Sequence, residues 1–125
     1  MKLNSFRNFI ERYADVTDKD WEIISTCFEQ RFFEKDEIIL MEGKICRHLY
    51  FLENGLLRYY INKDGNEITK FFTEAPYCFT SQVSFTDQKP ATENIQAIER
   101  SIVWQTTLVK ANEMLQLKSW NTFIR

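Results

Sequence analysis

Hydroxyl and amide side chains are concentrated in one short stretch of this sequence. Four of the five residues at 80–84 carry such a group, and the stretch lies between an apolar run at 77–79 and Pro90. We expect a short helical loop set between two strands. The first turn of a helix presents free backbone N–H groups that can bind an anion, and hydroxyl and amide groups can add hydrogen bonds. The same side chains could instead bond to the backbone of their own turn, so a purely structural interpretation stays open.

Side chains suited to catalysis or metal binding are scarce. His48 is the only histidine, whereas metal sites of the cupin kind need two or three histidines and a carboxylate. No Ser-His-Asp or Cys-His set can be assembled around it. Cys27, Cys46 and Cys78 are widely spaced and form no C-x-x-C pair, which suits free thiols in a reducing cytoplasm. We therefore expect no enzyme, no metal and no cofactor.

Composition limits the partners that the chain can bind. The 125 residues carry a net charge of -2, and the pI is about 5.5. A domain that grips duplex DNA by itself usually has a basic face and a high pI, so direct DNA binding is not expected. No signal peptide or membrane span is visible, and we expect a cytoplasmic protein. The 11 phenylalanines favour β structure.

Residues 1–29 and 108–125 read as helices that flank a β region. The first helix places Phe6, Phe9, Ile10 and Tyr13 at helical spacing, and Thr17 or Asp18 can cap the second. At the other end, residues 108–117 have helical spacing, with Met114 or Leu115 on the apolar side, and Ser119 resembles the cap of a last helix. Trp120, Phe123 and Ile124 lie on one face of that helix, and we interpret its early end as a truncation.

Residues 30–107 read as about eight short strands. A turn signal recurs roughly every 8–12 residues, which is typical of a sandwich or barrel. Asp64-Gly65 is a hairpin signal, because glycine accepts the positive φ that such turns require. Leu57, Tyr59 and Ile61 should share one strand face. Eight strands are enough for a double-sheet jelly roll.

Several short motifs, in this order, resemble a known family. They are Glu42-Gly43, the strand and turn at 49–55, Arg58, and Ala97-Ile98-Glu99. Over roughly residues 20–125 the chain resembles the N-terminal cyclic-nucleotide-binding domain of Crp/Fnr-type transcriptional regulators. The resemblance implies a mainly β, double-sheet jelly roll with flanking helices, and one sensor domain over 1–125. It implies DNA contact only through a helix-turn-helix domain that this chain lacks.

The resemblance also implies a ligand pocket at the phosphate-binding cassette of that family. Alignment on Pro90 and residues 97–99 places Gln82 where the family has a ribose-binding Glu, and Ala91 where it has a phosphate-binding Arg. Glu93 shares a strand face with Ala91 and would repel an anion. The implied pocket residues are Phe79, Thr80, Ser81, Gln82, Val83, Ser84, Ala91, Thr92 and Glu93. We therefore expect that the cassette does not bind cAMP in the usual way.

Two interpretations of this altered cassette remain. The pocket could have changed to another small effector, uncharged or cationic, or it could be empty in a scaffold that only dimerises. In the family the last helix forms the subunit interface, so Trp120, Phe123 and Ile124 are predicted to form a homodimer contact. The leading function is the sensor and dimerisation domain of a Crp/Fnr-like regulator. The alternative is a stand-alone small-molecule-binding or interaction module without a DNA partner.

Overall fold

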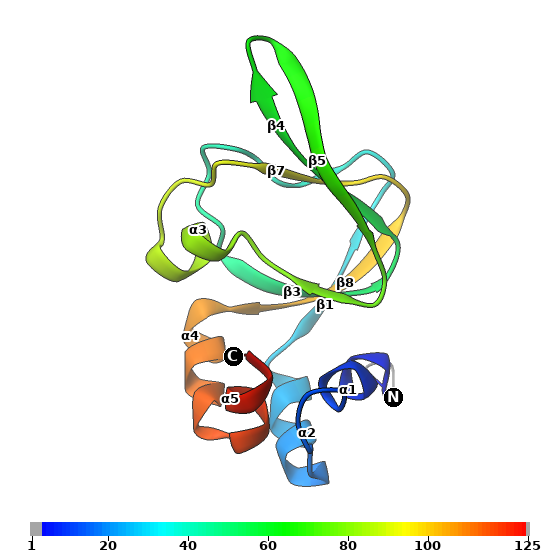
Figure 1. Cartoon of the computed structure of the whole chain (residues 1–125). Helices are drawn as coiled ribbons and strands as arrows, with labels where there is room; N and C mark the ends of the chain where they lie inside the picture. Colours follow the sequence, from blue (N-terminus) through cyan, green and yellow to red (C-terminus); the bar gives the residue numbers. More distant parts are fainter. Residues whose placement is uncertain (1–3, 125) are drawn as a thin grey trace.

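The computed structural model describes residues 4–124, which form two four-stranded antiparallel sheets with flanking helices (Figure 1). One sheet has the strand order β1-β8-β3-β6, and the other has β2-β7-β4-β5. The strands are β1 (Glu29–Phe33), β2 (Ile38–Leu40), β3 (His48–Asn54), β4 (Leu56–Lys63), β5 (Asn66–Glu74), β6 (Tyr77–Phe79), β7 (Asn94–Ala97) and β8 (Ser101–Thr107). The helices are α1 (Asn4–Ile10), α2 (Asp18–Thr26), α3 (Gln82–Asp87), α4 (Leu108–Glu113), the 3-10 helix η1 (Met114–Gln116) and α5 (Lys118–Ile124). The predicted double-sheet fold with flanking helices is confirmed.

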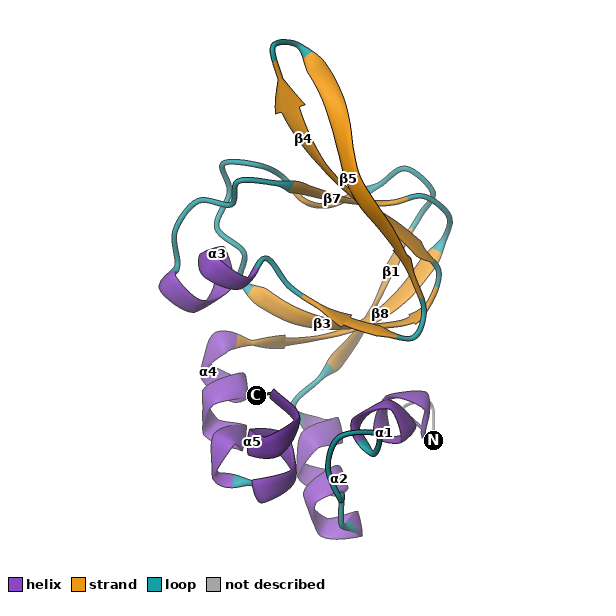
Figure 2. Cartoon of the chain, in the orientation of Figure 1, coloured by secondary structure: helices purple, strands orange, loops and turns teal. Residues whose placement is uncertain are grey.

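The helices fall into two groups with different positions. Figure 2 shows α1, α2, α4 and α5 gathered on the outer side of the sheet that contains β3 and β8, whereas α3 lies at one end between the two sheets. Among residues 4–124, no helix has the length and apolar character needed to cross a membrane.

Strand β3 separates two parts of the core. Neighbouring strand residues point to opposite faces, and here both faces are covered. The ring of Tyr50 stacks on Phe79 of β6 inside the roll, with centroids 4.8 Å apart. The ring of Phe51 points to the helices and stacks on Phe6 of α1 at 4.5 Å. Since Phe51 and Phe6 have no exposed surface, the helices are part of the folding unit.

Helix α2 begins as the sequence predicted. The Thr17 hydroxyl accepts a hydrogen bond from the backbone N–H of Asp20 at 3.1 Å, which satisfies one free donor of the first turn. Asp18 and Asp20 place negative charge at the positive end of the helix dipole. The helix then buries Trp21 and Ile24.

Two turns use backbone conformations that favour glycine. Asp64 and Gly65 have φ values of 52° and 81°, which confirms the predicted hairpin between β4 and β5. Gly55 joins β3 to β4 at φ 129°, and a Cβ at this position would collide with Ser101 of β8. The close approach of the β3–β4 turn to β8 therefore requires a glycine at position 55.

Two local predictions need correction, and one open alternative is decided. The pairing of β4 shifts register between Tyr59 and Tyr60, so both tyrosines are buried and Ile61 is only half-buried. A bulge of this kind re-aims the side chains that follow it. In the C-terminal part, α4 tightens into η1, which buries Met114 and leaves Leu115 37% exposed, so Met114 is the one of the two that lies on the apolar side. Ser119 lies inside α5 and donates its hydroxyl to Asp20 Oδ2 at 2.9 Å, so it does not cap that helix.

Candidate ligand pocket

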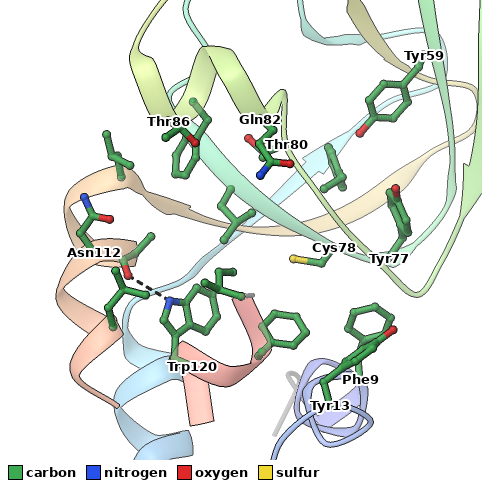
Figure 3. Close-up of a pocket in the computed structure, with 18 of the residues that line it drawn as sticks. Phe9, Tyr13, Tyr59, Tyr77, Cys78, Thr80, Gln82, Thr86, Asn112 and Trp120 are labelled. Carbon is green, nitrogen blue, oxygen red and sulfur yellow. Dashed lines mark hydrogen bonds between the residues drawn. The ribbon is translucent and has the colours of Figure 1, made fainter. Parts of the chain in front are cut away.

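A cavity of about 730 Å³ lies beside the cassette, between the roll and the helices (Figure 3). This volume is in the range of small-molecule sites, which is roughly 300–1,000 Å³. Its aromatic lining comprises Phe9, Tyr13, Tyr59, Phe71, Tyr77, Phe79, Phe85, Trp120 and Phe123. Its other apolar residues are Leu49, Cys78, Leu108, Ala111, Leu115 and Ile124. Its polar residues are Thr80, Gln82, Thr86, Glu93 and Asn112.

One end of the cavity is built from tyrosines. Tyr59 of β4 stacks on Phe71 of β5, with ring centroids 4.3 Å apart. The hydroxyl ends of Tyr59 and Tyr77 point into the same part of the cavity (Figure 3). Burial raises the pKa of Tyr59 well above its usual value, and the nearby Tyr77 and Glu93 raise this pKa further. Tyr59 therefore stays a neutral phenol that can donate or accept a hydrogen bond.

The hydroxyl groups of the cassette hold its own loop in place. Thr80 donates to the backbone carbonyl of His48 at 2.8 Å. Ser84 accepts from the N–H of Cys46 at 2.8 Å and donates to the carbonyl of Lys89. Gln88 follows α3 with a φ of 55° and donates its amide to the Phe85 carbonyl at 2.7 Å. These bonds match the structural interpretation of the hydroxyl groups.

Gln82 differs from those hydroxyl residues. It is exposed, it lines the cavity, and its side chain makes no hydrogen bond to another of the residues 4–124. Figure 3 shows its amide group directed toward the interior of the cavity. Gln82 can therefore offer a carbonyl oxygen and an N–H₂ group to a ligand.

The structure divides the predicted pocket residues into two sets. Those that line the cavity are Phe79, Thr80, Gln82 and Glu93. Those that lie outside its lining are the buried Ser81, Ser84 and Ala91 and the exposed Val83 and Thr92. Ligand binding by these residues stays a prediction. The alignment with the cassette could identify only residues of one loop and the strand after it. Most of the residues that line the cavity come from other elements.

Sequence reasoning missed four residues of β4, β5 and β6 that line the cavity, which are Tyr59 of β4, Phe71 of β5, and Tyr77 and Cys78 of β6. Tyr59 was predicted to share a face with Leu57, but nothing in the sequence indicated that this face was open to a cavity. Cys78 lies two positions before the predicted pocket residue Thr80, so the strand period could have placed it on the same side. Burial raises the pKa of the Cys78 thiol to about 12, so this wall carries no thiolate near neutral pH.

The charge of the lining is unusual for a site that would hold an anion. Among the described lining residues, Glu93 is the only one with a charged side chain, and arginine, lysine and histidine are absent. Arg58, which resembles a family motif residue, binds Glu67 at 2.7 Å and Gln96 at 2.8 Å and is not part of the lining. A bound phosphate would have to be stabilised by hydrogen bonds alone, because no cationic side chain of the described lining could offset its charge.

The three predicted interface residues form a wall of this cavity. Trp120 is fully buried within one chain, where it packs on Phe28 and donates Nε1–H to the carbonyl of Ala111 at 3.1 Å (Figure 3). Phe123 is partly buried, and Ile124 is 41% exposed. Trp120 therefore cannot touch a second chain unless α5 moves. The homodimer contact stays a prediction.

Comparison with known proteins gives the fold a family context. The family model described as Cyclic nucleotide-binding domain matches residues 30–118. A search of curated proteins found no match.

Solved structures resemble this chain at low sequence identity. The Catabolite Activator Protein of Thermus thermophilus has a TM-score of 0.76 and 15% identity, over 86% of this chain and 51% of that one. The N-terminal domain of a transcriptional regulator from Streptomyces coelicolor A3(2) has a TM-score of 0.72 and 14% identity, over 88% and 78%. A mutant of CooA from Carboxydothermus hydrogenoformans has a TM-score of 0.70 and 15% identity, over 86% and 68%. This chain spans about half the length of the Thermus protein, and the likeness concerns the fold alone.

Proposed function

The chain belongs to the family of cyclic nucleotide-binding domains, and on that premise we propose that it is the ligand-sensing domain of a cytoplasmic Crp/Fnr-type transcriptional regulator. The order of helices, jelly roll and C-terminal helices supports this, as do the matched structures of a catabolite activator and of a regulator's N-terminal domain. Its activity is binding rather than catalysis. Effector binding would shift the equilibrium between two arrangements of a dimer. This shift would change the position of a DNA-binding module encoded beyond residue 125.

We further propose that the effector is not cAMP bound in the usual way. The observation that carries this proposal is the absence of a cationic side chain from the described cavity lining. Ala91, at the position of the family's arginine, is 4% exposed, and its backbone N–H donates to the Lys44 carbonyl at 2.7 Å. A methyl group packed at this position cannot reach a phosphate.

The expected loss of affinity is large. Removing one partner of a buried charge pair costs about 2–5 kcal/mol. By the relation between free energy and affinity, this is roughly 30-fold to several thousand-fold. A cassette that retains only backbone N–H groups and Gln82 should therefore hold a cyclic nucleotide weakly.

Calorimetry with cAMP and cGMP tests the proposal. The unmodified chain should give no saturable heat in the micromolar range. A Gln82→Glu, Ala91→Arg double variant, with its fold checked by circular dichroism, should gain at least about tenfold in cAMP affinity, equal to about 1.4 kcal/mol. Micromolar binding of cAMP by the unmodified chain would overturn the proposed loss of the anion clamp.

The alternative is a module of the same fold that acts without DNA. It is favoured by the hydrogen bonds of Thr80 and Ser84 to the backbone, since such a cassette is stable without a ligand. The full-length gene distinguishes the two candidates. A regulator continues into a long helix and a basic helix-turn-helix, whereas a stand-alone module stops near residue 125.

A further inference from the structure

We propose that the cavity binds a small organic cation whose charged group lies between the tyrosine end and Glu93. The inference rests on the proposed sensing function, because it takes this cavity to be the effector site. It adds the chemical class of the effector.

Charge is the first argument. Glu93 contributes the sole charged side chain among the described lining residues, and it forms no ion pair with any of residues 4–124. It lies near Tyr59, because Tyr59 of β4 pairs with Ile95 of β7 and Glu93 precedes Ile95 by two positions. A carboxylate that has no cationic partner attracts a cation and repels an anion.

Aromatic faces are the second argument. Tyr59 is held by its stack on Phe71, and the ring of Tyr77 completes this end of the cavity. A cation over the face of an aromatic ring is attracted by the electrons of the ring, and desolvation strengthens the attraction. Sites that combine several aromatic rings with a carboxylate suit ammonium groups, including those that carry no N–H.

Hydrogen-bond chemistry and shape agree with the first two arguments. The oxygens of Tyr59, Tyr77 and Gln82 can accept hydrogen bonds from a protonated amine or amidine. On the side of the C-terminal helices, Leu108, Leu115 and Ile124 give an apolar wall. The cavity of about 730 Å³ therefore suits a molecule with a cationic head and an apolar body.

The experiment compares three probes that share a phenyl ring and differ in charge: benzyltrimethylammonium, benzyl alcohol and benzoate. Binding to the whole chain is followed by NMR titration of the backbone amides of β6 and α3. Benzyltrimethylammonium should bind at least about tenfold more tightly than benzyl alcohol, and benzoate should not bind in the millimolar range.

Variants at Glu93 and Tyr59 test the roles of these two residues. Glu93→Gln removes the charge and keeps the shape, and it should weaken binding of the cation about tenfold or more without changing the affinity for benzyl alcohol. The matched control is Glu99→Gln, because Glu99 is exposed, follows on the same segment and does not line the cavity. Tyr59→Leu should also weaken binding of benzyltrimethylammonium. Tyr59→Phe keeps the aromatic ring and should retain most of the affinity for this cation.

The outcomes separate this inference from the proposed function. Equal binding of benzyl alcohol and the cation, or an unchanged affinity in Glu93→Gln, would overturn the cation inference while leaving a small-molecule site in place. No response to any of the three probes at millimolar concentration would overturn both. Preferred binding of benzoate would overturn the cation inference and the proposed loss of anion binding.

Discussion

Replacing Trp120 with alanine tests whether this side chain belongs to the core of one chain or to a contact between two. Trp120 has no exposed surface in a single chain and is fixed by Phe28 and by its bond to the Ala111 carbonyl. Burying such a side chain removes roughly 150–250 Å² from water, and at about 25 cal/mol per Å² this is roughly 4–6 kcal/mol. Aromatic-to-alanine changes in cores cost about 3–5 kcal/mol, and we expect the free energy of unfolding to fall by this amount.

Urea unfolding at two protein concentrations provides the assay. The loss should be the same at both concentrations, because the contacts are within one chain. Ile124→Ala, at a position that is 41% exposed, is the control and should cost less than about 1 kcal/mol. If the alanine variant does not fold, Trp120→Phe leaves the Ala111 carbonyl without its donor and should cost about 1–3 kcal/mol. A loss below about 1 kcal/mol for Trp120→Ala, or a loss that appears only at high protein concentration, would refute the core assignment.

Three further changes are predicted from local structure and can be measured by the same urea method. Thr17→Ala removes the side-chain cap of α2 and should cost about 1 kcal/mol; an unchanged midpoint would show that the cap is not needed. Gly55→Ala combines a positive φ with a collision with Ser101 and should cost more than about 2 kcal/mol, whereas Gly43→Ala, with a φ of 90° and open space around it, should cost less. Burial raises the pKa of Cys78 from 9.0 to about 12, so the folded chain holds this proton more tightly, and the corresponding stability is complete below pH 9 and lost as the pH rises toward 12. When the pH is raised above 9, the free energy of unfolding should therefore fall less in Cys78→Ala than in the unmodified chain. An equal fall in both proteins would contradict this.

The fold could be predicted from the sequence because each of its elements has a local signal. The period of the apolar residues separates helices from strands, Asp64-Gly65 marks a hairpin, and Thr17 marks a helix start. These signals depend on neighbours in the sequence. The bulge at Tyr59 and Tyr60 depends instead on how β4 pairs with β5, so strict alternation placed Ile61 on the wrong face.

The site could be predicted only in part, for the same physical reason. Residues 79–93 include Phe79, Thr80, Gln82 and Glu93 of the cavity lining, because a single loop and the strand after it are contiguous in sequence. The tyrosine end and the helical wall come from segments that meet only after both sheets have formed. The burial of Trp120 within its own chain was equally hidden, because an amphipathic helix does not reveal whether its partner is in the same chain.

Phe123 links the floor of the cavity to the N-terminal segment. Its ring lies 6.4 Å from Phe6, 6.0 Å from Phe9 and 5.8 Å from Tyr13, measured between ring centroids. Aromatic pairs of this kind contribute about 0.5–1.5 kcal/mol each, so separating all three would cost roughly 1.5–4.5 kcal/mol. A ligand larger than this cavity would have to displace α5. Its own contacts with the protein would then have to supply at least this free energy. The contacts of Phe123 with Phe6, Phe9 and Tyr13 thus set a minimum binding free energy. A ligand that binds more weakly than this can occupy the cavity but cannot displace α5.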